Sequence, residues 1–213
     1  NLNSFALYAI GDVYHPSWIE HDKRLREKRI QYTIDCICLA KKLGIKNIST
    51  EPGGPISIEE NKIESDVWLK IFIEGLKKVE LVAEENNVKI LVEPEPSLLI
   101  ENSHQFLQLM KTICSDYIKL NFDIGHFYCV KEDPSETILK LMDYIEHFHL
   151  ADIANNRVHN HLLPGMGSID FERVFDTIKS IGYKGFVTVE LYTYQDNPID
   201  IARQSYNYLK VFI

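Results

Sequence analysis

Four acidic or histidine residues each follow a short apolar run that is typical of a β-strand. They are Glu93 after KILV, Asp123 after IKLNF, His149 after IEHF and Glu190 after GFVTV. When strands and helices alternate, the carboxyl ends of the parallel strands share one face, so side chains at these positions converge there. Three carboxylates and one imidazole suit a divalent cation such as Mn²⁺, Mg²⁺, Co²⁺ or Zn²⁺. The sequence therefore predicts one divalent metal site.

The chain alternates between strand and helix patterns along its whole length. Strands are predicted over 4–10, 45–50, 88–92, 118–122, 145–150 and 186–191. Helices are predicted over 22–43 and 103–113, through the apolar positions 68–83, and from the starts near Asp133, Asp170 and Pro198. A capping-box pattern at 57–60 precedes the second helix. These are six strand–helix units, with no low-complexity linker to divide residues 1–213 into more than one domain.

Alternating units fit either an open doubly wound sheet or a (β/α) barrel. Neighbouring strands lie about 4.8 Å apart, so four strands in a flat row separate the outer two by roughly 14 Å. Glu93 and Glu190 cannot share one ion across that distance. If the four residues are ligands, the α/β fold is therefore a (β/α)8 TIM barrel. Six units are two fewer than eight, and the chain begins with Asn1 rather than Met, so we expect that the first two βα units are absent.

The composition of the chain excludes several classes of function. A net charge of −8 argues against a protein that binds duplex DNA, and the basic stretch at 23–29 is interpreted as a solvated helix face. No apolar run is long enough to span a bilayer, and no signal-peptide pattern is visible. The four cysteines lack zinc-ribbon spacing and indicate a reducing compartment, so a cytoplasmic location is expected. A small-molecule partner is expected, whereas nucleic acid and membranes are not, and a homo-oligomer is left open.

Each candidate ligand also has an ordinary structural interpretation. Glu93 on its own fits a solvated loop acid, and Glu95 is an alternative to it. Asp123 fits a turn or a helix cap. His147 and His149 point to the same side of a strand, so alternation cannot distinguish them, although His149 is closer to the carboxyl end. The four residues together, at matching strand ends, favour the metal site.

Polar groups in the loops are candidates for a substrate site. Arg157, His159 and His161 lie in the long loop after the fifth strand, where a substrate lid or phosphate grip is one interpretation and a solvated loop the other. The run at 164–171 suits a tight turn, and its glycines are weak evidence for an anion cradle. Glu51 ends an earlier strand and is expected to face the same site.

From residue 4 to its C-terminus, the chain resembles the xylose isomerase-like barrel superfamily, and especially the tagatose/psicose 3-epimerase kind. The resemblance is carried by VEP at 92–94, FDIGH at 122–126, HLAD at 149–152, HLLPGMGSIDF at 161–171 and GFVTVE at 185–190. It implies a metal set of Glu93, Asp123, His149 and Glu190, with the two glutamates as the catalytic acid and base. It also implies substrate contacts from His126 and, with looser spacing, from Arg157. We expect His161 and Glu51 to complete the substrate site.

The resemblance implies a metal-dependent sugar or sugar-phosphate isomerase or epimerase that works by proton transfer through a metal-stabilised enediolate. The rival in the same superfamily is a three-zinc phosphodiesterase of the endonuclease IV kind, which acts on abasic DNA. Such enzymes need histidines after two early strands, where this chain has Tyr8 and Glu51. His161 matches one of their extra ligands, and His159 stands where they carry an acid. A barrel that binds a metabolite without turning it over is the third hypothesis.

Overall fold

The computed structural model describes residues 4–6, 16–54 and 65–213. The chain divides into two compact units, residues 1–121 and 122–213. The rest of the predicted first strand (7–10) and the capping-box pattern at 57–60 lie outside the described residues. Among the helices that are described, none is both long and apolar enough to cross a membrane.

The first unit pairs its strands in parallel and in chain order. Strands β1 (Ser4–Ala6), β2 (Asn47–Thr50) and β3 (Lys89–Val92) are followed by β4 (Ile118–Asp123), whose last two residues belong to the second unit. The register aligns Ile48 with Ile90 and Ile90 with Ile118. All three of these isoleucine side chains are fully buried. Burial on both faces explains why the strands read as short apolar runs.

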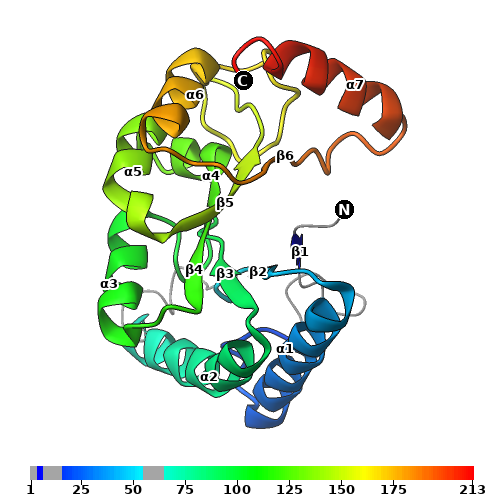
Figure 1. Ribbon diagram of the computed structural model, residues 1–213. Coiled ribbons are helices and arrows are strands. Elements are labelled where there is room, and N and C mark those ends of the chain that lie inside the picture. Colours follow the sequence, from blue (N-terminus) through cyan, green and yellow to red (C-terminus); the bar gives the residue numbers. More distant parts are fainter. Residues whose placement is uncertain (1–3, 7–15, 55–64) are drawn as a thin grey trace. The chain divides into compact units, whose positions relative to one another are not determined.

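Three helices cover this part of the sheet. They are α1 (Lys23–Leu43), α2 (Ser65–Asn86) and α3 (Ser103–Ile113), and they pack in order, α1 on α2 and α2 on α3 (Figure 1). Helix α1 begins where the Asp22 carboxylate accepts the N–H of Arg24, and it ends at Gly44, whose φ of 72° suits glycine. The predicted ranges 22–43 and 103–113 agree with α1 and α3 to within one residue.

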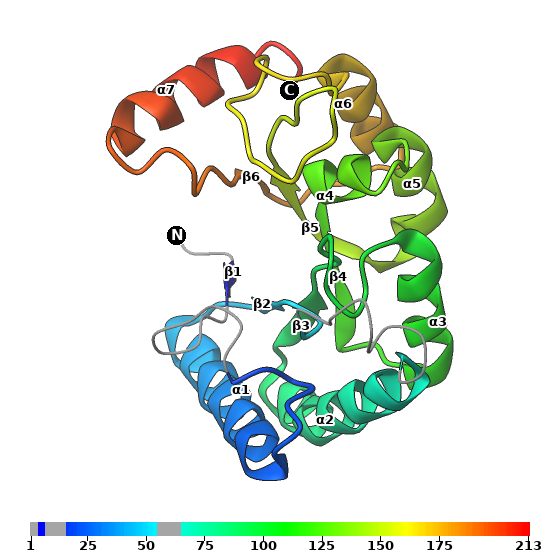
Figure 2. The ribbon, with the colours of Figure 1, turned by 180° about the vertical axis from the view of Figure 1, so that it is seen from behind.

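The second unit continues the alternation of strands and helices. Strands β5 (Ile145–Leu150) and β6 (Val187–Val189) pair in parallel, with Phe148 beside Val187. Helices α5 (Pro134–Leu141) and α6 (Phe171–Ser180) pack against each other, the short 3-10 helix η2 (Met142–Tyr144) leads into β5, and α7 (Pro198–Leu209) follows β6 (Figure 2). The aromatic rings of Phe122, Phe127 and Phe148 meet in its buried core.

One helix of the second unit was not predicted. Helix α4 (Ile124–Cys129) begins directly after β4, with Asp123 as its N-cap. The helix has only six residues, too few for an apolar period to stand out, and its Asp-x-Gly start is also typical of a turn. It turns the chain at the end of β4 and buries His126 beside Asp123.

Candidate metal centre

Asp123 lies at the end of β4 and is fully buried. One of its carboxylate oxygens, Oδ1, accepts a hydrogen bond from the backbone N–H of His126 at 2.9 Å. The other oxygen, Oδ2, is buried and has no hydrogen-bond partner among the described residues. A buried carboxylate oxygen without a partner is costly, and a bound cation is one of the few groups that offsets the cost.

Glu190 and His149 reach the same place from neighbouring strands. The backbone N–H of Glu190 donates to the carbonyl of Leu150, which extends the parallel pairing one residue beyond β6. The Oε2 atom of Glu190 then lies 3.5 Å from Nδ1 of His149. Within the second unit, the ligand atoms of Asp123, His149 and Glu190 all lie within 4.8 Å of one another. Three of the four predicted ligands are therefore brought together.

His161 approaches from the long loop after β5 and is almost fully buried. Its Nδ1 lies 2.9 Å from the backbone carbonyl oxygen of Glu190. A carbonyl oxygen only accepts, so Nδ1 carries the proton and Nε2 of the neutral ring has a free lone pair. That Nε2 faces the Nε2 atoms of His126 and His159, each at 3.3 Å.

The charged groups of this centre influence one another. Burial opposes ionisation of Asp123, but the nearby histidines and the His126 backbone N–H outweigh it and hold the pKa of the carboxyl below its usual range. Burial likewise opposes ionisation of Glu190, and the hydrogen bond and charge of His149 lower its pKa. Burial, reinforced by His126 and His161, lowers the pKa of His159 to about 4. Near neutral pH the centre therefore combines ionised carboxylates with an uncharged His159 imidazole.

His147 and His149, which the strand pattern left unresolved, have different surroundings. His147 is buried, and its Nε2 lies 2.9 Å from the Thr188 hydroxyl. Burial, with a smaller effect of His149, lowers the pKa of His147 to about 4. His149 instead directs Nδ1 toward the Glu190 carboxylate. His149 therefore faces another predicted ligand, whereas His147 packs as a neutral core residue.

Glu93 belongs to the first unit and directly follows β3. Its backbone N–H donates to the Thr50 carbonyl at 3.0 Å. Its Oε2 accepts hydrogen bonds from the Asn121 side-chain amide at 2.8 Å and from the Ser49 hydroxyl at 3.2 Å. The role of Glu93 as a ligand stays a prediction.

Two predicted substrate residues contact other protein groups. Glu51 is buried in the first unit, where its Oε1 lies 2.6 Å from the Arg29 guanidinium. In the second unit, Arg157 donates to the Tyr128 carbonyl at 2.7 Å, and its guanidinium lies 4.1 Å from the centre of the Tyr128 ring. Arg157 also has a φ of 59°, an uncommon conformation for a residue with a side chain. Their roles in substrate binding stay predictions.

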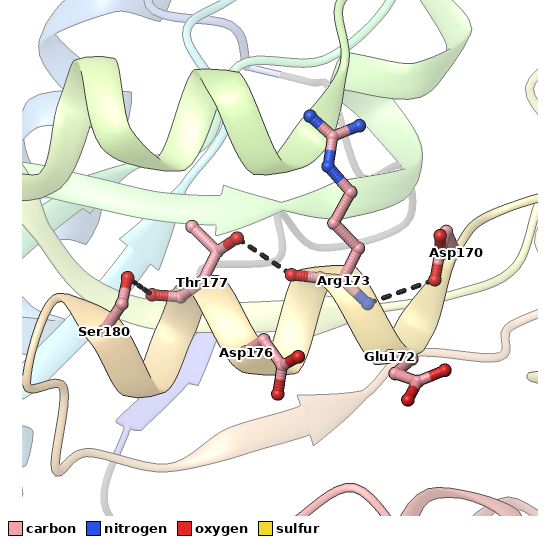
Figure 3. Close-up of a pocket in the computed structure, with 6 residues that line it drawn as sticks. All are labelled: Asp170, Glu172, Arg173, Asp176, Thr177 and Ser180. Carbon is pink, nitrogen blue, oxygen red and sulfur yellow. Dashed lines mark hydrogen bonds between the residues drawn. The ribbon is translucent and has the colours of Figure 1, made fainter.

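A surface depression on α6 is separate from these groups. It is lined by Asp170, Glu172, Arg173, Asp176, Thr177 and Ser180, all from the helix and its N-cap (Figure 3). The Arg173 side chain extends away from the helix and pairs with Asp133 at 2.7 Å. The hydroxyls of Thr177 and Ser180 bond to carbonyls of the same helix. These contacts are those of a solvated helix face.

A family model described as a xylose isomerase-like TIM barrel matches residues 2–212. The chain belongs to this family. Membership confirms the predicted (β/α) barrel class and excludes the open doubly wound sheet that alternation of strands and helices alone left open.

Several known proteins are similar to this xylose isomerase-like barrel. Inosose dehydratase of Clostridium perfringens is 27% identical over 176 residues, which cover 73% of this chain and 58% of that enzyme. A D-tagatose 3-epimerase-like protein has a TM-score of 0.81 and 25% identity, over 98% of this chain and 77% of that one. The IolI protein, solved with a zinc atom, has a TM-score of 0.78 and 21% identity, over 99% and 77% of the two chains. The chain thus spans less than two thirds of the dehydratase.

One buried acid of this barrel was not among the predicted site residues. Asp152 follows His149 by three residues and accepts the backbone N–H groups of Gly165 and Gly167. The glycine-rich run that the sequence suggested as an anion cradle therefore holds a carboxylate of the same chain. The spacing of an acid after the strand and two glycines in the following loop was the available signal, but it does not show that the two meet.

Proposed function

We propose that this chain forms the metal-binding part of an enzyme that moves a proton on the carbon beside a carbonyl group of a sugar or sugar phosphate. The observation that carries the proposal is the convergence of Asp123, His149 and Glu190 within 4.8 Å, with one Asp123 oxygen buried and unbonded among the described residues. Carboxylate oxygens and one imidazole suit Mn²⁺, Mg²⁺, Co²⁺ or Zn²⁺. By their names, the relatives include an inosose dehydratase and a D-tagatose 3-epimerase-like protein.

We propose Glu93 as the fourth ligand and as one of two catalytic carboxylates. Its carboxylate accepts the side-chain amide of Asn121. Asn121 and Asp123 are alternate residues of β4, and alternate residues of a strand point to the same side. This placement, together with the position of Glu93 after β3, supports the prediction made from the strand ends.

The proposed reaction needs a metal ion, residues that move a proton and residues that hold the substrate. A divalent ion held by these residues would supply Lewis acidity that makes the carbon-bound proton easier to remove. One glutamate, Glu93 or Glu190, accepts that proton, and the other returns it on the opposite face for an epimerisation. For an aldose–ketose isomerisation one of them can serve both steps. We assign His126, His161 and Arg157 the task of bonding to substrate oxygens.

Dehydration is the second candidate, because the curated relative at 27% identity is an inosose dehydratase. Loss of water beside a carbonyl also begins with removal of the neighbouring carbon-bound proton. The two candidates then diverge, since an epimerase returns the proton whereas a dehydratase expels a hydroxyl group. Product mass separates them, because dehydration lowers it by one water and isomerisation leaves it unchanged.

The zinc phosphodiesterase is favoured by one observation only. The imidazoles of His126, His159 and His161 have ligand atoms within 4.8 Å of one another and could hold a further ion. Elemental analysis decides this point. One ion per chain, lost in His149→Ala and kept in His147→Gln, supports the isomerase or epimerase. About three zinc ions per chain would favour the phosphodiesterase instead.

The test of the proposed reaction is proton exchange in D₂O, with a panel of ketoses, aldoses, their phosphates and inosose. Wild type should transfer deuterium from solvent to the substrate carbon. If both glutamates move protons, as in an epimerisation, Glu93→Gln and Glu190→Gln should each abolish turnover while retaining part of the metal affinity. Glu95→Gln, two residues beyond Glu93, is the matched control and should exchange normally. Full activity of Glu190→Gln would contradict the assignment, and binding without exchange in wild type would indicate a non-catalytic barrel.

A further inference from the structure

Asp152 is 1% exposed, and its carboxylate accepts four hydrogen bonds from backbone N–H groups. Each of its oxygens accepts two backbone N–H groups. Oδ1 bonds to Ile153 at 2.9 Å and Ile169 at 3.1 Å, and Oδ2 bonds to Gly165 at 2.9 Å and Gly167 at 2.7 Å. Charge-assisted hydrogen bonds of this kind are roughly twice as strong as neutral ones. The side chain thereby joins both ends of the loop 153–169.

The backbone of Asp152 holds the middle of the same loop. Its N–H donates to the Leu162 carbonyl at 2.9 Å, and the Leu162 N–H donates back to the Asp152 carbonyl at 2.8 Å. His161 directly precedes Leu162, and its own carbonyl accepts the Thr193 hydroxyl at 2.6 Å. The position of the His161 backbone is therefore defined from both sides.

The glycines of the loop are matched to this carboxylate. A Cβ atom on Gly167 would collide with the Asp152 carboxylate and with the Ile153 carbonyl. Gly165 has a φ of 90°, which residues with side chains rarely adopt. The close approach of the backbone at residue 167 to Asp152 therefore requires glycine.

We infer that Asp152 is a positioning residue for the candidate site. By fixing the loop 153–169, it holds His161 so that Nδ1–H donates to the Glu190 carbonyl and Nε2 is presented to His126. The loop also carries Arg157 and His159. The inference rests on the proposed function for its effect on turnover, whereas the effect on His161 stands independently.

The competing interpretation is that Asp152 only stabilises the loop, without consequence for the imidazole. The two are separated by the tautomer of His161, read from long-range ¹H–¹⁵N spectra of the metal-free protein near pH 7.5. In wild type we expect one fixed Nδ1–H tautomer. Asp152→Asn retains the size of the side chain but faces the loop with an amide donor, so His161 should change to an averaged pair of tautomers.

Asp133→Ala is the matched control. Asp133 also accepts a backbone N–H, at the start of α5, and its loss removes a helix cap without touching the loop 153–169. This variant should lower stability and leave the His161 signals unchanged. Gly167→Ala disturbs the Asp152 bonds from the opposite side and should reproduce the effect of Asp152→Asn; it supplies the same test if Asp152→Asn does not fold.

Turnover supplies the second measurement. In the exchange assay, Asp152→Asn should lower kcat/KM by about 100-fold, the loss typical of a misplaced catalytic group. Unchanged His161 spectra in both loop variants, or an equal change in Asp133→Ala, would overturn the inference. A wild-type protein that exchanges no proton would instead refute the proposed reaction, and would leave the spectroscopic result intact.

Discussion

Asp123 gives one carboxylate oxygen to the backbone N–H of His126, at 2.9 Å, and leaves the other buried without a hydrogen-bond partner among the described residues. The first contact fixes the direction of the second oxygen, because the carboxylate is planar and its Cβ is held by β4. The N-cap of α4 therefore also orients the oxygen that we propose as a metal ligand. Buried carboxylates are ordinarily satisfied on both oxygens, so this arrangement favours binding of a cation over stability.

Asp123→Asn should separate metal binding from stability. Asparagine keeps an oxygen for the His126 N–H and replaces the ligand oxygen by an amide nitrogen, which does not coordinate a cation. We expect affinity for Mn²⁺ or Zn²⁺ to fall by at least about 100-fold, a larger effect than the roughly 10–100-fold typical of outer contacts. In EDTA, the free energy of unfolding should change by less than about 1 kcal/mol. Calorimetric titration and urea denaturation measure the two; retained affinity would remove Asp123 from the metal set.

His147 predicts a pH dependence of stability. Burial lowers its pKa from the ordinary 6.5 to about 4, so folding favours the neutral ring. The stabilisation is complete above pH 6.5 and is lost as the pH falls through about 4. It amounts to at most about 3–4 kcal/mol over this window.

His147→Gln can keep the contact with Thr188 and cannot gain a proton, so its stability should depend less steeply on pH between 6.5 and 4. Urea denaturation in EDTA at half-unit pH steps measures the slope. His104→Gln removes an exposed imidazole of α3 and is the control. Equal slopes for wild type and His147→Gln would show that His147 is not the responsible group.

The proposed substrate binding by Arg157 should depend on its planar guanidinium rather than on its charge alone. The group stacks on Tyr128 and donates to the Tyr128 carbonyl, a geometry that lysine cannot reproduce. With a substrate identified by the exchange assay, Arg157→Lys should raise KM about tenfold or more, because a misdirected cation no longer bonds to a substrate oxygen. Tyr128→Phe keeps the ring and the carbonyl and should leave KM unchanged. A normal KM in Arg157→Lys would indicate that Arg157 only holds its loop.

The fold was largely predictable because its elements are short, apolar and clearly bounded. The predicted bounds of α3 and β5 agree with the structure. Asp133 caps a helix as its capping pattern indicated, and Asp22 and Asp170 cap the helices predicted to begin near them. The predicted 186–191 strand is reduced to Val187–Val189, whose residues are only partly buried or exposed. Helix α4 was missed because six residues give no reliable period.

The candidate site was predictable only where it depends on strand ends. Parallel pairing places the carboxyl ends of β4, β5 and β6 near one another, so the proximity of Asp123, His149 and Glu190 was predictable from the pattern alone. The positions of His159 and His161 depend on a loop, and sequence periodicity carries no information on its path. That path is set by Asp152, whose four N–H donors lie up to 17 residues further along the chain. The pairing of Glu51 with Arg29 was also not predictable, because the two residues are distant in the sequence and no local pattern links them.

The Arg29–Glu51 pair gives the last prediction. Arg29 is fully buried, lies 2.6 Å from the Glu51 carboxylate and also donates to the Thr50 hydroxyl. Arg29→Met would leave a buried carboxylate without its cation, so we expect a loss of about 3–5 kcal/mol, and the double variant with Glu51→Gln should recover part of it. The exposed Lys78–Glu27 pair, also at 2.6 Å, is the control, and Lys78→Met should cost less than about 1 kcal/mol. Urea denaturation of these three variants and of wild type measures the differences. If Arg29→Met costs no more than Lys78→Met, the pair does not stabilise the fold, and substrate binding becomes the better explanation for the buried Glu51.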